Sequence, residues 1–264
     1  MQEIEYVEDL RGAEERVLRA VHGLSTVLER EALPEDPPPP YEEFLADLEA
    51  QPSYVKPHYW LLWGDDRALA GSARFRARYR EDNRHIGRVS VELHPKHRGK
   101  GVSPRLLLPA VEAAAADART LIQGYTYEGG PGEGFAEKLG AKLAISEAHN
   151  RLTLSDVDRP MLEDWVAKAP ERASEYSLLF WEGPCPDERV DRFAELKHVM
   201  NTAPMSDSWE DEVFTPEMLT EEDALAQKAG WVPWNYVAVH EPTGEWGGYT
   251  RLFPGVFRPQ FAYQ

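Results

Sequence analysis

The sequence predicts a mixed α/β (α+β) fold in which helices pack on sheets without a regular βαβ repeat. Segments that alternate apolar and polar residues, as strands do, are interspersed with segments whose apolar residues recur every three to four positions, as in helices. One strand pattern, residues 86–93, leads through a glycine-containing turn into an Ala- and Leu-rich helix. A strand–turn–strand pattern in the first half occurs again near the end of the chain. These three observations indicate layered sheets and a partly duplicated chain.

Composition limits the function classes that fit. The 264 residues could form one large domain or two smaller ones, and a hydrophobic content of 42% is typical of a globular protein. The net charge of −17 argues against non-specific binding of nucleic acid, because the phosphate backbone would be repelled. It is compatible with a cationic substrate such as an amine, although acidic surfaces also serve solubility alone.

Cysteine and histidine usage argues against a metal or disulfide framework. Cys185 is the only cysteine, and it lies between two prolines in a predicted turn, where a catalytic thiol is not expected. His85, His94 and His97 lack metal-ligand spacing, so no metal site is predicted. The sequence contains no apolar run of about 20 residues and no signal-peptide pattern, which predicts a soluble cytoplasmic protein without membrane partners.

The chain begins with a predicted strand and two helices. Residues 4–7 have strand character, and residues 12–31 carry apolar residues at helical spacing. The proline-rich residues 34–40 separate this helix from a short amphipathic helix at residues 41–50. Such prolines favour a rigid spacer, although the same pattern is found in recognition motifs.

A hairpin and a third strand are predicted next. Residues 59–63 and 68–75 read as its two strands, and residues 64–67 close it with a Gly-Asp-Asp turn. Residues 86–93 form the following strand, after a charged loop at residues 78–84. Together these segments predict three neighbouring strands.

The first half ends with two further pairs of helix and strand. The helix at residues 103–119 is expected to have Ser103 as its N-cap, and residues 120–127 form the strand that follows. A short helix at residues 135–139 ends at a glycine, and residues 141–154 supply a last strand.

The second half restarts the pattern after a helical bridge at residues 155–172. A strand is expected at residues 176–181, and helices are expected at residues 187–200 and 215–229, the latter capped by Thr215. A second hairpin follows at residues 236–239 and 247–252. Three residues of the first hairpin recur in it at one constant offset, since Tyr59, Gly71 and Arg74 correspond to Tyr236, Gly248 and Arg251.

This duplication predicts three parts. Residues 1–154 form a first domain, residues 155–174 a helical linker, and residues 175–264 a partial second module. The second copy ends where its counterpart of residues 86–103 would begin. It is therefore expected to have no glycine turn of its own.

The turn after residues 86–93 is the strongest candidate for a binding site. Gly99 and Gly101 permit a sharp turn, and the helix behind it begins with unpaired N–H donors and the positive end of its dipole. A strand, a glycine turn and a helix N-terminus together suit a pyrophosphate, although the segment could also be an ordinary turn. The residues fit neither a Walker loop nor a dinucleotide fingerprint, which would need Gly or Ala where Pro104 stands.

Two segments resemble the GNAT superfamily of acyl-CoA-dependent N-acyltransferases. Residues 93–103 resemble motif A of that family, with Leu93, Pro95, Arg98, Gly101 and Ser103 in the matching positions. Residues 135–141, Phe-Ala-Glu-Lys-Leu-Gly-Ala, resemble a second family motif. The resemblance covers residues 4–154. The second half resembles the front part of another GNAT module, as in tandem GNAT proteins, whose complete form would continue past Gln264.

The resemblance implies transfer of an acetyl or other acyl group from the CoA thioester to a primary amine of a small molecule, with acetyl-CoA as co-substrate. By the same resemblance, backbone groups of the strand end would pair with pantetheine, and Arg98 and Lys100 would add charge toward the phosphates unless they are merely solvated. The residues expected to bind CoA are Leu93, His94, Pro95, Arg98, Gly99, Lys100, Gly101, Val102, Ser103 and Phe135.

The catalytic groups are less well defined. The family often uses a tyrosine to protonate the leaving thiolate, and that position is Ala136 here. Tyr125 and Tyr127 are candidate substitutes, or are simply aromatic residues of the strand. Glu92 is the candidate base, or an exposed strand glutamate.

Two alternatives stay open. The chain could be a non-catalytic CoA-binding or interaction module, or a fragment of a tandem enzyme whose active site lies in a further part. The incomplete second sheet predicts a homodimer or a partner that completes the second module. No nucleic-acid partner is expected.

Overall fold

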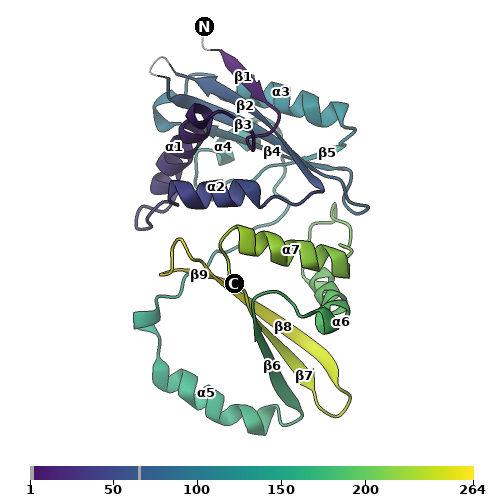
Figure 1. The fold of residues 1–264 in the computed structure, drawn as a ribbon. Helices are drawn as coiled ribbons and strands as arrows, with labels where there is room; N and C mark the ends of the chain where they lie inside the picture. The colour runs from purple at the N-terminus through teal and green to yellow at the C-terminus, as the bar shows by residue number, and fades with distance from the viewer. Residues whose placement is uncertain (1–2, 65–66) are drawn as a thin grey trace.

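The computed structural model describes residues 3–64 and 67–264, which form two sheets with helices packed on them (Figure 1). The predicted hairpin turn at residues 64–67 includes residues 65–66, which lie outside the described part. The first sheet has the strand order β1-β2-β3-β4-β5, antiparallel as far as β4 and parallel between β4 and β5. Its strands are β1 Ile4–Val7, β2 Val55–Trp63, β3 Leu69–Arg78, β4 Ile86–Leu93 and β5 Leu121–Gln123.

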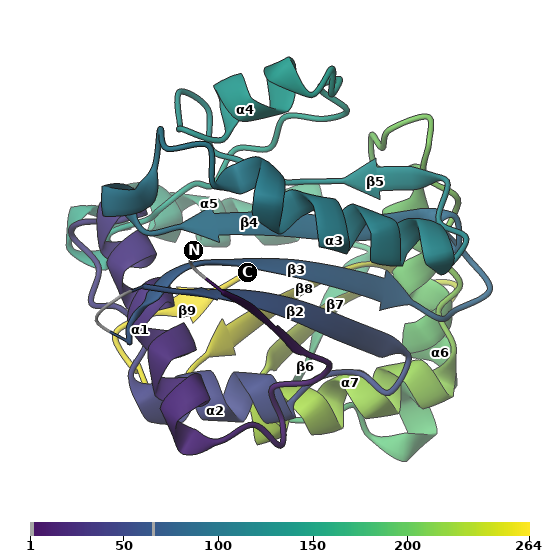
Figure 2. The same cartoon turned by 90° about the horizontal axis from the view of Figure 1, so that it is seen from above.

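Helices cover both faces of the first sheet. In Figures 1 and 2, α1 (Glu15–Ala32) and α2 (Tyr41–Glu49) lie on one face and α3 (Ser103–Ala116) lies on the other. A single-turn 3-10 helix, η1 (Pro95–His97), follows β4, and the short α4 (Glu133–Lys138) follows β5. This arrangement confirms the mixed α/β fold that the sequence predicts.

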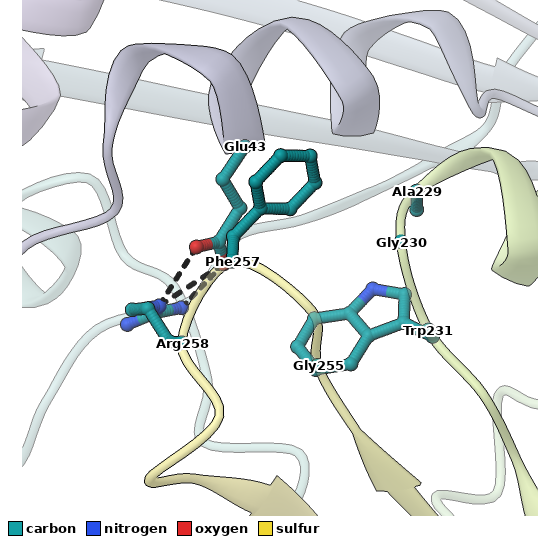
Figure 3. Close-up of a pocket in the computed structure, with 7 residues that line it drawn as sticks. All are labelled: Glu43, Ala229, Gly230, Trp231, Gly255, Phe257 and Arg258. Atoms are coloured by element: carbon teal, nitrogen blue, oxygen red, sulfur yellow. Dashed lines mark hydrogen bonds and ion pairs between the residues drawn. The ribbon is translucent and has the colours of Figure 1, made fainter.

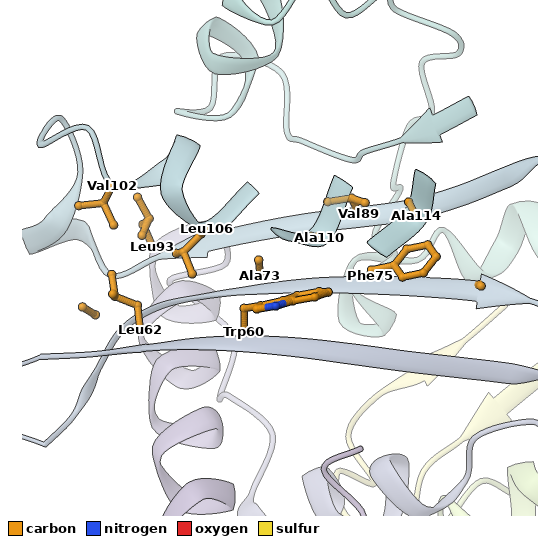
Figure 4. Close-up of a cluster of buried hydrophobic side chains, with 12 residues drawn as sticks. Trp60, Leu62, Ala73, Phe75, Val89, Leu93, Val102, Leu106, Ala110 and Ala114 are labelled. Atoms are coloured by element: carbon orange, nitrogen blue, oxygen red, sulfur yellow. The ribbon is translucent and has the colours of Figure 1, made fainter. Parts of the chain in front are cut away.

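The pleat of the first sheet divides its core in two. Side chains such as Phe75 and Leu93 point toward α3, where Leu106 and Ala110 pack on them (Figure 4). Alternate side chains, including Leu61, point toward α1 and α2. Because a strand directs successive side chains to opposite faces, every residue of β3 and β4 can be assigned to the α3 face or the α1/α2 face.

The second sheet repeats the order of the first. It runs β6-β7-β8-β9, all antiparallel, and one face packs on α6 (Asp187–Lys197) and α7 (Pro216–Lys228) around Phe193 and Val237. A 3-10 helix, η3 (His198–Thr202), continues α6. The strands are β6 Tyr176–Glu182, β7 Trp234–His240, β8 Glu245–Pro254 and β9 Ala262–Tyr263.

The bridge between the sheets is helical, as expected. It contains η2 (Leu154–Asp156) and α5 (Arg159–Arg172), and Asp158 caps α5 by accepting a hydrogen bond from the N–H of Met161. Near the C-terminal end, Trp231 forms an isolated bridge with Gly255.

The strand registers correct one of the predicted correspondences. Gly71 pairs with Leu62 and Gly248 with Ala238, so these glycines are equivalent. Arg74 pairs with Tyr59, whereas Arg251 pairs with Asn235, so Tyr59 corresponds to Asn235 and not to Tyr236. The chain from Ala238 to Gly248 is one residue longer than the chain from Leu62 to Gly71, so one constant offset does not hold for both strands of the hairpin.

Three other expectations about the first half are wrong. Residues 141–153 contain no strand, because β5 ends at Gln123 and offers almost no edge for pairing. The strand expected over residues 120–127 is shorter than predicted and covers only Leu121–Gln123. Ser103 is the first residue of α3 and not its cap; the cap position is Val102, whose side chain accepts no hydrogen bond.

The two sheets are connected by polar contacts as well as by the chain. The loop at residues 203–214 reaches the first sheet, where Glu212 pairs with Arg78 at 2.7 Å. At the other end of the interface, Arg258 donates to both carboxylate oxygens of Glu43 on α2, beside Phe257 and Trp231 (Figure 3). The small pocket there is too narrow for a water molecule, so the interface is closed at this point.

Candidate functional site

The candidate site begins where β4 and β5 separate. These parallel strands pair only over Ile86–Arg88 and Leu121–Gln123, after which β5 ends and β4 continues to Leu93. The second half of β4 therefore has a partner on its β3 side but none on its β5 side within the described chain. This leaves a strand edge inside the domain to which an extended ligand could add.

The free backbone groups on this edge belong to alternate residues. The N–H of His94 donates to the carbonyl of Ala70, so His94, and with it Glu92, directs its backbone groups toward β3. Val91 and Leu93 consequently direct theirs toward the open side. The resemblance implied that the backbone around Glu92, Leu93 and His94 at the strand end pairs with pantetheine; of these three residues, only Leu93 presents its backbone groups to the open side.

The turn after β4 has the conformation that its glycines permit. η1 occupies Pro95–His97, and the Nδ1 atom of His94 accepts a hydrogen bond from the N–H of Lys96 at 3.2 Å. Gly99 and Gly101 both have φ of +70°, in the left-handed region that costs a residue with a Cβ free energy. A Cβ at either position would contact nothing, so the glycines are required here by conformation and not by space.

The turn presents backbone donors to solvent. Among the described residues, the N–H groups of Gly99 to Ser103 have no acceptor, and α3 begins without a side-chain cap. Consecutive free N–H groups at a helix N-terminus form a site for an anion, because the helix dipole adds to their partial positive charge. Val102 is buried and fixes this end of α3 on the core.

Of Arg98 and Lys100, the basic side chains expected to face the phosphates, one is already paired. Arg98 donates to both oxygens of Glu31, at 2.6 and 2.5 Å, from the end of α1. This contact lowers the pKa of Glu31 and raises that of Arg98. Lys100 is exposed and has no ion-pair partner among the described residues. Arg98 must therefore exchange partners, or be shared, to contact a ligand.

Glu92, the candidate base, is exposed on the α1/α2 face of β4. Its Oε2 accepts a long hydrogen bond, 3.4 Å, from the hydroxyl of Ser72, its neighbour on β3. The charge of Glu92 contributes, after burial, to a raised pKa of Glu29 on α1. Glu92 is therefore next to the free edge of β4 and accessible to a substrate from the face opposite α3.

The tyrosines lie outside the sheet. Tyr125 and Tyr127 follow the end of β5, are 67% and 56% exposed, and have their rings 6.0 Å apart. The hydroxyl of Tyr125 lies 3.1 Å from Nε2 of His149, a partner that the sequence did not indicate. Neither ring is part of an apolar core, which removes the interpretation that they are core residues of a strand. Phe135 lies on α4, half-buried, beside Ala136.

Cys185 does not resemble a nucleophile. Burial and the nearby charge of Asp223 raise the pKa of its thiol to about 11, so it is protonated at neutral pH. Its backbone N–H donates to Asp223, as expected for a structural turn.

Sequence patterns did not indicate two groups near the site. Glu31 lies on α1, 67 residues before Arg98, and nothing in its local sequence indicates a contact with Arg98. The arginines Arg74, Arg76 and Arg88 share the face of Glu92, and the strict alternation of Arg74, Arg76 and Arg78 along β3 was the signal that could have revealed them. Within the described residues no group of three or more His, Cys, Asp or Glu side chains is suited to a metal ion, and no helix is long and apolar enough to span a membrane.

Comparisons with known proteins agree with this geometry. Residues 21–140 match the Acetyltransferase (GNAT) family, a region that includes the β4 edge, the glycine turn and α3. A comparison with curated proteins gave no match.

Solved structures extend the similarity to the second sheet. A tandem GNAT protein from the clavulanic acid biosynthesis pathway, solved without AcCoA, matches 96% of this chain and 75% of its own with 20% identity and a TM-score of 0.66. An acetyltransferase from Trypanosoma brucei matches 57% of this chain and 99% of its own at 19% identity and a TM-score of 0.37. An aminoglycoside N-acetyltransferase in complex with CoA matches 58% and 96% at 16% identity and a TM-score of 0.41. The first of these shows a similar fold across both sheets.

Proposed function

We propose that this protein transfers an acetyl group from acetyl-CoA to the primary amine of a small molecule, because residues 21–140 match the Acetyltransferase (GNAT) family. One observation carries the proposal. The free edge of β4, the turn with free N–H groups and the uncapped N-terminus of α3 follow one another without interruption along the chain. A ligand with an extended amide-containing arm that ends in a pyrophosphate needs these features in the same order: a strand edge for the arm, then N–H donors and a helix N-terminus for the pyrophosphate.

In this proposal the backbone binds the co-substrate. The backbone N–H groups of Val91 and Leu93 donate hydrogen bonds to the pantetheine carbonyls, and their backbone carbonyls accept hydrogen bonds from the pantetheine N–H groups, as in a neighbouring strand. The N–H groups of Gly99 to Ser103 donate to the pyrophosphate, and the α3 dipole stabilises its charge. Lys100 adds a cation at the surface. The thioester then lies near the point where β4 and β5 separate.

The transfer itself requires a base and an acid. The amine nitrogen attacks the thioester carbon, a C–N bond forms, and the C–S bond breaks. Glu92, directly or through water, takes the proton that the amine loses, and the departing thiolate takes a proton from Tyr125 or Tyr127. The exposed position of Glu92 on the face opposite α3 supports its role, because an acceptor can approach from that side.

Binding is tested by calorimetric titration with acetyl-CoA. We expect wild type to bind and Gly101→Glu to bind at least about 30-fold more weakly, because the new carboxylate repels the pyrophosphate and the strained backbone misplaces the donors. Gly244→Glu is a matched control: Gly244 has φ of +71° and equally open surroundings, but it lies in the hairpin of the second sheet. Equal binding by wild type and Gly101→Glu, or no binding by wild type, would contradict the proposal.

A non-catalytic CoA-binding module is the second candidate. It is favoured by Ala136 in place of the motif tyrosine and by the contact of Tyr125 with His149. Thiol release from acetyl-CoA in the presence of a panel of amines separates the two candidates. Turnover that Glu92→Gln abolishes would exclude the non-catalytic module, whereas tight binding without turnover of any amine would favour it.

A further inference from the structure

Three arginines gather on the α1/α2 face of the first sheet, beside the candidate site. Arg76 on β3 is directly opposite Arg88 on β4, and Arg74 lies two residues further along β3, opposite Ser90. Side chains of directly opposed residues are neighbours on the same face, with Cβ atoms about 5 Å apart. The alternate residues of β3, such as Phe75, pack toward α3, so the arginines point away from that helix.

Among the described residues, the carboxylates near this cluster do not pair with it. Burial and the charge of Arg78 lower the pKa of Arg88, and the charges of Glu212 and Glu147 only partly oppose this. Within the described chain, Arg74, Arg76 and Arg88 form no ion pair, although Arg78 in the same row is paired with Glu212. Arg88 lies 5.4 Å from the ring of Trp209, which comes from the loop at residues 203–214. Burial lowers the pKa of Arg76, and the charges of Arg74 and Arg88 lower it further. An anion placed among the three side chains would relieve both their repulsion and their loss of hydration.

The equivalent arginine of the second sheet shows what a structural role looks like. Arg251 occupies the register position of Arg74, and it donates to Asn235 at 2.7 Å and to the buried carboxylate of Asp223. Tyr59 takes the place of Asn235 in the first sheet, and no carboxylate pairs with Arg74 there. The same position is therefore neutralised within the fold in one sheet and left available in the other.

We propose that Arg74, Arg76 and Arg88 bind the anionic group of the acceptor, so that the substrate is an amine that also carries a carboxylate or a phosphate. This rests on the proposed function, because it places the amine at Glu92. Glu92 is on the same face of β4 as Arg88, and its row is about 7 Å along the strands from the row of Arg74, within reach of an arginine side chain.

The position of the cluster distinguishes the acceptor from CoA. Arg88 is the last residue of β4 that pairs with β5, whereas the glycine turn begins beyond the opposite end of the free edge. The phosphates of CoA are assigned to that turn. An anion at Arg88 therefore belongs to the second substrate, and this positive face stands out in a chain whose net charge is −17.

The first test measures binding without turnover. The protein is saturated with CoA, which carries no acetyl group to transfer, and is titrated in a calorimeter with β-alanine and with phosphoethanolamine. We expect wild type to bind one of them, and Arg76→Gln and the more exposed Arg88→Gln to bind it at least about 10-fold more weakly, as for the loss of a charge-assisted contact. Arg19→Gln, on the exposed side of α1, is the matched control.

The two ligands distinguish a carboxylate from a phosphate. The partners that lack the anionic group, β-alaninamide and ethanolamine, should bind at least about 10-fold more weakly to wild type and equally to all four proteins. Failure of both anionic amines to bind, or equal binding to wild type and Arg76→Gln, overturns the proposal.

The second test separates this inference from the proposed function. With acetyl-CoA, the ratio of kcat/KM for phosphoethanolamine over ethanolamine, or for β-alanine over its amide, should fall at least about 10-fold in Arg76→Gln through a raised KM. Binding that depends on the arginines without any turnover would leave the anion site standing and refute acetyl transfer. Turnover of the amines without an anionic group at the rate of their anionic partners would refute the anion site and leave acetyl transfer standing.

Discussion

The two sheets of this protein begin alike and end differently. In each, the strands lie in the order in which they occur in the chain, antiparallel except between β4 and β5, with a pair of helices on one face, and Gly71 and Gly248 occupy equivalent positions. In the first, the third strand is followed by an eight-residue β4, a glycine turn and α3; in the second, it is followed by the two-residue β9. The residues proposed to bind CoA lie in this segment after the third strand, whereas Arg74 and Arg76 lie on the third strand itself.

The difference also changes what covers the sheets. α3 buries Phe75 and its neighbours on the first sheet, whereas on the second the corresponding face exposes Leu178 and Phe180 at 73% and 46%. The two sheets therefore share a hairpin frame and a pair of helices on one face, and they differ in what lies on the opposite face.

The largest expected effect comes from breaking the contact that joins the two sheets. Arg258→Met leaves the carboxylate of Glu43, whose side chain is 3% exposed, buried without its partner. Removing one member of a buried pair typically costs about 3–5 kcal/mol of the free energy of unfolding, which urea denaturation measures. If the sheets unfold as one unit, the whole transition shifts; if they are independent, two transitions appear.

A second ion pair across the same interface provides the control. Lys228 contacts Glu49 at 3.2 Å, but both side chains are about half exposed, so Lys228→Met should cost under about 1 kcal/mol. Equal effects of Arg258→Met and Lys228→Met would mean that burial at Glu43 is not what stabilises the interface.

The next effect compares the N-termini of α7 and α3. The Oγ1 of Thr215 accepts the N–H of Met218 at 3.3 Å, so Thr215→Ala should lose about 1 kcal/mol of stability. Ser103 makes no such bond, so Ser103→Ala should change stability by less than about 0.5 kcal/mol. Thermal unfolding without ligand measures both, and a larger loss from Ser103→Ala would show that α3 is capped by its own side chain, against the role of its free donors.

How far the sequence predicted these features depends on the range of the interactions. Strand and helix periodicity, the left-handed glycines Gly99 and Gly101 and the cap at Thr215 are local properties, and the structure confirms them. The strand expected at residues 141–154 is wrong because alternation cannot show whether a neighbouring edge exists to pair with.

The site was predictable to the same degree. The turn could be located from a continuous stretch of chain, and its assignment to CoA stays a prediction, as do the roles of Glu92 and the two tyrosines. Contacts between distant segments, such as Arg98 with Glu31 and Arg78 with Glu212, could not be derived, because nothing local marks either partner. The arginine cluster could not be predicted without the register between β3 and β4, which places Arg76 opposite Arg88.

The smallest expected effect concerns carboxylates on the equivalent helices α2 and α7. Asp223 on α7 is paired with Arg251, but Asp47 on α2 forms no ion pair among the described residues, and burial and the nearby charges of Glu43 and Glu29 raise its pKa to about 6. The folded protein therefore holds this proton more tightly than the unfolded chain, whose ordinary value is 3.8. The charged form destabilises folding fully above about pH 6, and the penalty disappears as the pH falls toward 3.8.

Asp47→Asn removes that penalty. Since Asp47 stays exposed enough for water to screen it, the gain in the free energy of unfolding should be only a few tenths of a kcal/mol, to about 1 kcal/mol, at pH 8. The gain should shrink at pH 5 and vanish at pH 4, as urea denaturation at the three pH values would show. Glu42→Gln, an exposed change on the same helix, should lack this pH dependence. A gain that is constant with pH would contradict the raised pKa of Asp47. It would mean that Arg258 already neutralises the carboxylates of Glu43 and Glu29 that act on Asp47.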